Sequence, residues 1–371
     1  MDTELLEKSL DAVLGKFMVN GKRVVTEQLK NGHINCTFRI TVEDDDNSFK
    51  VYVVQAINTY VFKNPTQVME NIGAVTKHIK KKYDDYGISS YRKVLDFLTT
   101  ADGKNYYSDD SGNFWRAYTF VHDSASYDIS DDPKIIYNAG LAFGKFQQLL
   151  SDFPAHELRI TIPDFHNTPK RMDDFFDAVE KDPLGRCKDI QEEIEFFRQH
   201  RATACRLQKL LDEGKLPLRV THNDTKCNNV LVDDTTGEPL CVIDLDTIMP
   251  GLSVLDFGDA VRFACNTAAE DEKDLSKVSL NMELYENFTK GFIGELKGFF
   301  GEVELENMAW GALIISIELA SRFLKDHIEG DKYFRIHHEN HNLERARNQI
   351  ALAKDMEKKF DQMCSIVKKY S

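Results

Sequence analysis

Two short segments of the chain carry side chains that could transfer a phosphoryl group. Residues 222–229 read His-Asn-Asp-Thr-Lys-Cys-Asn-Asn, and residues 243–246 read Ile-Asp-Leu-Asp. Phosphoryl transfer requires a carboxylate that accepts the proton of the attacking hydroxyl and a pair of oxygen ligands for magnesium. The two segments supply all three, with Asp224 as the expected catalytic base and Asn229 and Asp244 as the expected metal ligands.

The spacing of these residues predicts that they converge. Asp224 and Asn229 are five positions apart in a stretch without helical or strand periodicity, so both can project from one loop. Residues 230–232 and 240–243 predict two short strands joined by a turn. Because a hairpin brings its ends together, we expect Asp244 to return beside Asn229.

Three neighbouring residues are expected to support this loop rather than to react. His222 would orient the loop through its ring nitrogens, because Asp224 already fills the role of base. Asp246 would share a face with Asp244 if the strand continued, and it would then support the metal or be structural. Cys227 is expected to be a small filler residue rather than a reactive thiol.

Residues 256–258 read Asp-Phe-Gly, which is also the sequence of a magnesium-binding motif in protein kinases. We reject that role because Asp244 already takes the metal position and no hairpin returns the later segment to it. Asp256 or Asp259 is instead expected to hydrogen-bond the backbone of the loop at residues 222–229 and to hold it rigid.

These motifs resemble those of the aminoglycoside phosphotransferase and choline kinase superfamily, and within it those of the N-acetylhexosamine 1-kinases. The resemblance implies an α+β, bilobal, protein-kinase-like fold, in which a small five-stranded antiparallel N-lobe with one helix joins a larger, mainly helical C-lobe. It also implies ATP as the phosphoryl donor and Mg²⁺ as the cofactor. The blocks that carry it cover nearly the whole chain: residues 31–35, 55–58, 165–168, 221–230, 242–251, 256–259, 326–334 and 342–347.

The first third of the chain predicts strands and one inserted helix. Asn64 is expected to cap that helix, with Pro65 at its first position and Gln67 reaching back to the cap. The predicted buried stripe of the helix is Val68, Ile72, Val75 and Ile79. The predicted strands cover residues 24–29, 36–42, 49–57, 92–98 and 114–121.

Three further helices are predicted. Residues 1–16 predict an amphipathic helix without the pattern of a signal peptide. Residues 133–150 predict the first helix of the large lobe, and the apolar run at residues 309–319 predicts a buried core helix that is too short to span a bilayer. The residues expected on the buried face of the N-terminal helix are Leu5, Leu6, Leu10, Val13 and Leu14.

Residues 122–126 interrupt the strand pattern and are the expected hinge between the lobes, where an adenine would lie against backbone amides and carbonyls. His122 and Asp123 are therefore predicted nucleotide-binding residues. The expected domains are residues 1–122, the nucleotide phosphate-binding sheet, and residues 123–371, which would hold the catalytic loop, the metal site and the substrate pocket.

One glycine is expected to help bind the nucleotide phosphates, although the chain has no Walker A motif. Residues 140–146 are one position short of that motif, lack its Ser or Thr and lie in a helical pattern. Gly32, in the turn at residues 30–35, would permit a tight turn whose amides face phosphate. The resemblance implies that this turn overhangs the cleft, so His33 is a candidate substrate-binding residue.

Protein kinases also hold phosphate with a lysine on the third strand, paired to a glutamate on the small-lobe helix. Glu70 is the expected glutamate here. The lysine is missing, because residues 55–56 lie where relatives carry a basic residue and no Lys or Arg occurs between Lys50 and Lys63. Either one of these two lysines reaches in from an end of the strand, or amides and metal hold the phosphates.

The acceptor pocket is expected in the large lobe. Glu318 and Arg322 are four residues apart and could form a partly buried ion pair. The resemblance implies instead that Arg322, Tyr333 and Phe263 line a sugar pocket. Residues 165–168 also carry the resemblance, but the sequence suggests no physical role for them.

The charge of the chain limits its partners. The 371 residues include 47 Lys and Arg against 61 Asp and Glu, which gives a net charge of −14. This acidity argues against a surface for nucleic acid or for an anionic membrane. It suits a cytoplasmic enzyme, and seven cysteines without a C-x-x-C pair point to reduced thiols.

The expected activity is that of an ATP-dependent sugar kinase, which phosphorylates the anomeric hydroxyl of N-acetylglucosamine or N-acetylgalactosamine to give the sugar 1-phosphate. A kinase of the same fold acting on an amino alcohol or an aminoglycoside is the first alternative. Such cationic acceptors need acidic or aromatic cages, whereas Arg322 would repel them. The second alternative is a pseudokinase that binds nucleotide without turnover, which the missing lysine of the third strand allows.

Overall fold

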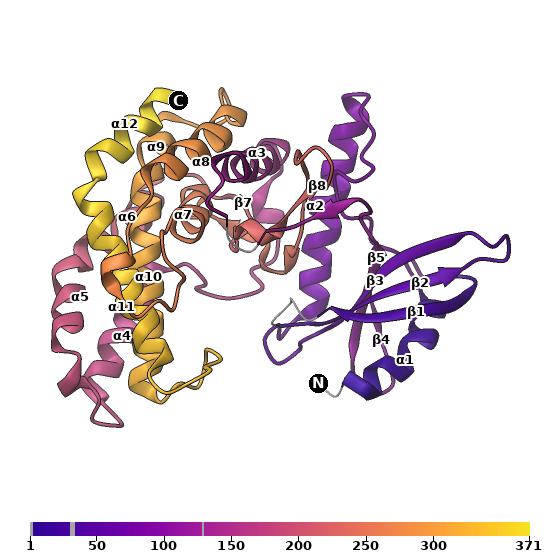
Figure 1. Cartoon of the computed structure of the whole chain (residues 1–371), viewed down its shortest axis with the longest axis horizontal. Coiled ribbons are helices and arrows are strands. Elements are labelled where there is room, and N and C mark those ends of the chain that lie inside the picture. Colours follow the sequence, from indigo (N-terminus) through magenta and orange to yellow (C-terminus); the bar gives the residue numbers. More distant parts are fainter. Residues whose placement is uncertain (1–2, 30–33, 128–129) are drawn as a thin grey trace.

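The computed structural model describes residues 3–29, 34–127 and 130–371. Figure 1 shows the sheet of the first third of the chain at one end of the molecule and the helices of the remainder at the other. A five-stranded antiparallel sheet beside a mainly helical remainder confirms the expected α+β fold class. The division into domains after residue 122 stays a prediction.

The five-stranded sheet has the strand order β1-β2-β3-β5-β4. Its strands are β1 (Lys22–Leu29), β2 (Cys36–Glu43), β3 (Phe49–Ile57), β4 (Tyr107–Ser108) and β5 (Phe114–Thr119). The strand predicted over residues 92–98 forms only an isolated bridge, in which Phe97 pairs with Tyr118 of β5, and β4 is the fifth strand of the sheet. Val94 and Leu95 of this segment are buried in a cluster with residues of helix α2 (Pro65–Asp85). Arg92 has a positive φ of 60°, which an extended strand does not accommodate.

Helix α1 (Thr3–Lys16) packs against this sheet, in a cluster that contains Phe38, Val54 and Trp115. Four of the five residues predicted for its buried face are buried. The prediction for Leu5 is wrong, because this side chain is 60% exposed. Leu5 precedes the buried Leu6 and therefore points about 100° around the helix from it.

Helix α2 connects the sheet to the segment that carries the metal-ligand candidate Asp244. Its predicted buried stripe is confirmed, and it packs in a cluster with Ile57 of β3 and with Leu245 and Ile248 of the later segment. Pro65 is the first residue of the helix, as predicted. The expected cap is wrong, because the side chain of Asn64 makes no capping hydrogen bond.

Two small sheets position the loops that follow the five-stranded sheet. One has the order β6-β8-β9 and contains the predicted hairpin, in which Val230 pairs with Val242. In the other, β7 pairs with β10. Their strands are β6 (Ser124–Ala125), β7 (Arg219–Thr221), β8 (Val230–Asp233), β9 (Pro239–Val242) and β10 (Met249–Gly251).

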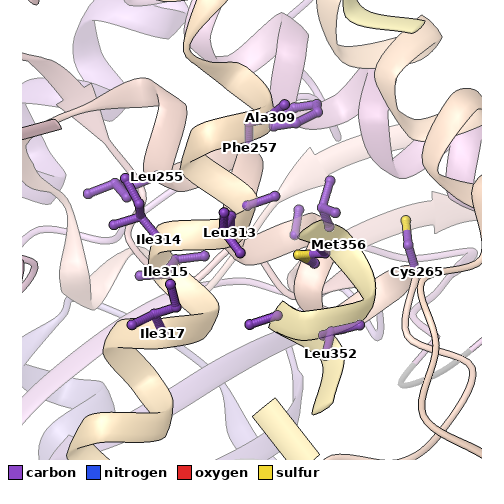
Figure 2. Packing of buried hydrophobic residues seen from close by; sticks show 14 of the residues in the cluster. Leu255, Phe257, Cys265, Ala309, Leu313, Ile314, Ile315, Ile317, Leu352 and Met356 are labelled. Carbon is purple, nitrogen blue, oxygen red and sulfur yellow. The ribbon is translucent and has the colours of Figure 1, made fainter. Parts of the chain in front are cut away.

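The predicted core helix is α10 (Met308–Glu329), and Figure 2 shows its apolar side chains packed with those of α7 (Ser253–Ala264) and α11 (His341–Lys358). Glycines let α7 and α10 approach closely. A Cβ on Gly311 would lie 1.9 Å from the carbonyl oxygen of Val254, so a larger residue would force the two helices apart. This close packing fixes α7, which carries Asp256 and Asp259.

Further helices complete the fold, and α3 and α8 pack on each other as an extensively contacting pair. All seven cysteines are free. None of the helices among the described residues has both the length and the apolar character that crossing a lipid bilayer would need. The remaining helical elements are α3 (Pro133–Leu149), α4 (Thr168–Lys181), α5 (Gln191–Ala204), α6 (Arg206–Asp212), α8 (Met282–Glu295), α9 (Glu302–Glu306), α12 (Phe360–Tyr370), and the 3₁₀ turns η1 (Ala155–Glu157), η2 (Cys187–Asp189), η3 (Cys227–Asn229), η4 (Leu245–Thr247) and η5 (Leu275–Lys277).

Candidate active site

The loop between β7 and β8 brings Asp224 and Asn229 together. The side-chain nitrogen of Asn229 donates to the backbone oxygen of Asp224 at 2.8 Å and lies 3.4 Å from the Asp224 carboxylate. Asn229 therefore turns its amide nitrogen toward Asp224, which leaves its amide oxygen as a possible metal ligand. The ammonium group of Lys226 lies 3.1 Å from the Asp224 carboxylate and forms an ion pair with it.

The hairpin returns Asp244 to this loop, as its sequence predicts. The backbone N–H of Ile243 donates to the carbonyl of Asn229 at 2.9 Å. Asp244 follows with a positive φ of 57°, which turns the chain into η4. Asp244 is exposed to solvent, and the protein packed around its carboxyl group, followed by the negative charges of Asp246 and Asp224, raises its pKa above the ordinary value. The backbone of Asp244 thus lies beside the loop that carries Asp224 and Asn229.

His222 connects the base candidate to the metal-ligand segment. Its ring is fully buried, and its Nε2 lies 2.9 Å from the carbonyl oxygen of Ile243. The backbone N–H of Asp224 donates to the other ring nitrogen at 3.3 Å. Both contacts suit one neutral tautomer, with the proton on Nε2. This geometry supports the expected orienting role of His222.

Both carboxylates predicted to hold the loop backbone do so. Asp256 accepts hydrogen bonds from the backbone N–H groups of His222 and Asn223, each at 2.8 Å. Asp259 accepts from the backbone N–H of Thr225 at 2.9 Å. Asp256 lies in helix α7, so residues 256–258 are not a metal-binding loop. Burial raises the pKa of Asp256 to about 6.

We predict that Asp256→Ala lowers the free energy of unfolding by about 2–4 kcal/mol, because it leaves two buried backbone N–H groups and the amide of Gln147 without an acceptor. Urea unfolding measures this change. The matched control is Asp110→Ala at an exposed position, which should stay within about 0.5 kcal/mol of the wild type. A loss below about 1 kcal/mol for Asp256→Ala would contradict the bracing role.

Lys50 and Lys63, the two lysines that could have replaced the missing lysine of the third strand, both contact other groups. Lys50 pairs with Asp44 at 2.6 Å, and the ammonium of Lys63 lies 4.4 Å from the ring centre of Tyr60. The expected pairing of Glu70 with a cation on the third strand is also wrong. Its half-exposed carboxylate lies 3.5 Å from Arg159 instead, on the solvent side of α2.

A buried arginine that the sequence did not single out lies in this region. Arg116 of β5 forms an ion pair with Asp246, and both side chains are 3% exposed. Asp246 also accepts a hydrogen bond from the side chain of Asn35 at 2.6 Å. Asp246 is thus bound to the sheet and to the turn that precedes β2.

Of the nucleotide-binding residues predicted in the hinge and the phosphate turn, the structure describes only His122 and Asp123. His122 and Asp123 are exposed and connect β5 to β6. The backbone N–H of Asp234 donates to the carbonyl of Asp123 at 3.2 Å, which ties this connection to the hairpin. Gly32 and His33 lie outside the described residues, so their roles stay predictions.

Two of the three predicted acceptor residues lie together. The guanidinium of Arg322 lies 5.4 Å from the ring centre of Phe165 and 5.7 Å from that of Phe334. Tyr333 is 70% exposed, and its ring centre lies 4.8 Å from that of Phe334. Phe263, the third predicted residue, is far from these two in the sequence. It lies near the C-terminal end of α7 and is partly exposed.

The structure gives residues 165–168 the physical role that the sequence lacked. His166 and Thr168 contact the fully buried carboxylate of Glu318, at 2.9 and 2.6 Å. The simple ion pair suggested for Glu318 and Arg322 is therefore replaced by a different arrangement, in which Glu318 binds His166 and Arg322 lies over Phe165.

The donor set at the end of the hairpin fits magnesium. Among the described residues, no group of three or more His, Cys, Asp and Glu side chains could hold a metal ion by itself. Mg²⁺ in kinases is bound by one or two carboxylates together with phosphates and waters, so a small protein donor set suffices. A divalent cation would offset the effects that raise the pKa of Asp244, which are desolvation first and then the negative charges of Asp246 and Asp224.

Sequence reasoning missed two charged residues of the site. Lys226 could have been found from its position two residues after Asp224, within the motif itself. Arg116 had no local signal, because only the register of β3 and β5 places it opposite Gln55. The thiol of Cys227 has a pKa that burial raises to about 12, which agrees with the expected filler role.

Comparisons with known proteins identify the family and the fold. The model of a phosphotransferase enzyme family matches residues 28–276. The structure of a microcompartment-associated aminopropanol kinase is similar at a TM-score of 0.64 and 14% identity, with 98% of each chain covered. An aminoglycoside phosphotransferase from Alicyclobacillus acidocaldarius is similar at 0.64 and 11%, with 97% of this chain and 96% of that chain covered. A choline kinase from Cryptosporidium parvum gives 0.57 and 12%, with 96% and 97% covered. At these identities the solved structures show the shared fold alone.

Proposed function

The chain belongs to the phosphotransferase enzyme family, and from this we propose that it is an ATP- and magnesium-dependent sugar kinase. Its acceptor would be the anomeric hydroxyl of N-acetylglucosamine or N-acetylgalactosamine, and its product the sugar 1-phosphate. The observation that supports the proposal is that Asn229 contacts Asp224 and that the β8–β9 hairpin returns Ile243, and with it Asp244, to Asn229.

The proposed mechanism assigns a task to each of these three residues and to their neighbours His222 and Lys226. Asp224 accepts the proton of the attacking sugar hydroxyl, and His222 fixes its backbone. Asn229 and Asp244 would hold magnesium, which when bound neutralises charge on the nucleotide phosphates. Lys226 lies 3.1 Å from Asp224 and would stabilise the negative charge of the transferring phosphoryl group.

Nucleotide binding is proposed for the sheet and the connection to the hairpin. The backbone at His122 and Asp123 would contact the adenine, since this segment joins β5 of the sheet to β6 of the smaller sheet. The turn that contains Gly32 would present amides to the phosphates. His33, in the same turn, would contact the acceptor.

The acceptor preference is proposed from charges near the catalytic loop. His166 contacts the carboxylate of Glu318 at 2.9 Å. Arg322 lies over the ring of Phe165, next to His166. The carboxylate of Glu318 is fully buried and bound by His166 and Thr168, whereas the side chain of Arg322 is partly exposed. An arginine beside aromatic rings suits hydroxyl and amide oxygens with an apolar sugar face, and it disfavours a cationic acceptor.

A panel of acceptors in an ADP-release assay tests this proposal. N-acetylglucosamine or N-acetylgalactosamine should give magnesium-dependent ADP release, and product analysis should place the phosphate on the anomeric oxygen. The matched controls are each sugar with its anomeric hydroxyl methylated, which should not react. If neither hexosamine reacts, the sugar proposal is wrong.

The alternative acceptors belong in the same panel. An amino alcohol or an aminoglycoside is favoured by the shared fold, since similar structures include an aminopropanol kinase and a choline kinase. Turnover of one of these compounds, with none for the hexosamines, would establish that alternative. Nucleotide binding without magnesium-dependent ATP consumption for any acceptor would instead favour the pseudokinase alternative.

A further inference from the structure

One buried ion pair lies between the sheet and the metal-ligand segment. Arg116 of β5 and Asp246 of η4 are each 3% exposed, and Asp246 lies two residues after Asp244. A buried ion pair is costly to desolvate and contributes little stability compared with apolar residues of the same size. The position of the pair therefore suggests a task beyond packing.

The register of the sheet places the guanidinium where a cation on β3 would otherwise be. Arg116 lies opposite Gln55, and its Nε donates to the side-chain oxygen of Gln55 at 2.7 Å. Its Nη1 donates to Asp246 and lies 3.9 Å from the sulfur of Met69 in α2. The guanidinium is thus enclosed by β3, by α2 and by the segment that carries Asp244.

The counter-ion is linked to the turn expected to bind phosphate. The second oxygen of Asp246 accepts from the side-chain nitrogen of Asn35 at 2.6 Å. The side-chain oxygen of Asn35 in turn accepts from the backbone N–H of Asn58 at 3.0 Å. These contacts, together with the bond from Arg116, connect Asn35, Gln55 and Asn58. The three residues belong to the sequence blocks 31–35 and 55–58, and they have no role in the catalytic loop or the acceptor pocket.

The other candidates for this task are engaged elsewhere. Lys50 and Lys63 contact Asp44 and Tyr60, and Glu70 pairs with Arg159. A guanidinium has five N–H donors, so the bonds to Gln55 and Asp246 leave donors for a further anion. Phosphate is the anion that a planar guanidinium binds best.

We propose that Arg116 of β5 is the phosphate-binding cation of the sheet and takes the role that a lysine on β3 has in protein kinases. Asp246 is its counter-ion and takes the role of the glutamate on α2. This inference rests on the proposed kinase function and names the residue that meets the nucleotide phosphates. Asp246 also couples the cation to Asp244, so that phosphate binding and the metal-ligand segment are positioned together.

Nucleotide affinity tests the proposal without an acceptor. The variant Arg116→Gln with Asp246→Asn removes both charges together and so leaves no unpaired buried charge. We expect its affinity for the magnesium complex of the non-hydrolysable ATP analogue AMP-PNP to fall by about 10- to 100-fold. Its affinity for adenosine, which has no phosphate, should stay within about twofold. The matched controls are Lys50→Met and Lys63→Met, which should bind AMP-PNP as the wild type does.

A second variant moves the cation back to β3. Gln55→Lys with Arg116→Gln keeps one positive charge near Asp246, and we expect it to bind AMP-PNP within about threefold of the wild type. The proposal is overturned if the first variant keeps its AMP-PNP affinity, or loses adenosine affinity by the same factor. If the first variant does not fold, Arg116→Gln alone is measured, and an AMP-PNP affinity equal to that of the wild type overturns the proposal. Failure of the wild type to phosphorylate any acceptor, with AMP-PNP still bound, would instead count against the proposed function.

Discussion

The Asp224→Asn variant is expected to lose about 10²- to 10⁴-fold in kcat, which is the contribution of a general base. Asparagine keeps the shape of the side chain and its contact with Asn229, but it cannot take the proton of the attacking hydroxyl. The KM values for ATP and for the acceptor should change little, because Asp224 acts on the proton and not on the nucleotide. Steady-state kinetics with the acceptor found in the panel measures both quantities.

The matched control for this variant is Asp234→Asn, an exposed aspartate in the turn of the same hairpin, which should keep its kcat within about twofold. An equal melting temperature for the two variants would exclude unfolding as the cause of lost activity. If Asp224→Asn retained a kcat within about threefold of the wild type, another group would have to be the base.

The Asp244→Asn variant is expected to weaken the apparent affinity for magnesium by about 100-fold or more. Residues that only support a metal ligand already contribute about 10- to 100-fold to metal affinity, and Asp244 is proposed to be a ligand itself. Activity at a fixed low magnesium concentration should fall by at least this factor. Part of it should return as magnesium is raised, because Asn229 and the phosphates still offer ligands. Titration of activity with MgCl₂ at saturating ATP measures the shift.

Glu238→Gln is the matched control for the metal variant, since it removes an exposed carboxylate from the turn at the other end of the same hairpin. Its magnesium dependence should equal that of the wild type. A magnesium dependence of Asp244→Asn that also equalled the wild type, with kcat reduced, would show that Asp244 has a role other than metal binding.

The catalytic loop and the hairpin could be predicted because their signals are local. The spacing of Asp224 and Asn229 and the short strands around a polar turn determine where Asp244 returns, and the observed bond between Ile243 and Asn229 agrees. The bracing of the loop by Asp256 or Asp259 was also predicted, because Asp244 already takes the metal position, and in the structure both carboxylates bind the loop backbone.

The rest of the site depends on contacts between distant segments. Arg116 meets Gln55 across 61 residues and Asp246 across 130, so only the assembled sheet reveals it. Glu70 of α2 was expected to pair with a cation on the third strand, but in the structure it pairs with Arg159. Residues 92–98 were predicted as a strand, but their apolar side chains Val94 and Leu95 are buried by packing in a loop against α2.

The acceptor region also depends on contacts between segments that are distant in the sequence. Residues 165–168 had no assigned role in the sequence, because their partner Glu318 lies about 150 residues away. Arg322 was proposed to contact a sugar from the resemblance alone, and its stacking between Phe165 and Phe334 gives that proposal a physical basis. Acceptor identity still has to come from turnover, since the shared fold serves several acceptor classes.

The central claim is that Asp224, Asn229 and Asp244 surround one site for a divalent ion and a reacting hydroxyl. The most direct test is a crystal structure of the wild-type protein with AMP-PNP and Mn²⁺, in which anomalous scattering locates the metal. The account predicts a metal peak within coordination distance of the amide oxygen of Asn229 and the carboxylate of Asp244, with Asp224 facing the terminal phosphate. A metal bound to the nucleotide but ligated by neither residue would contradict it.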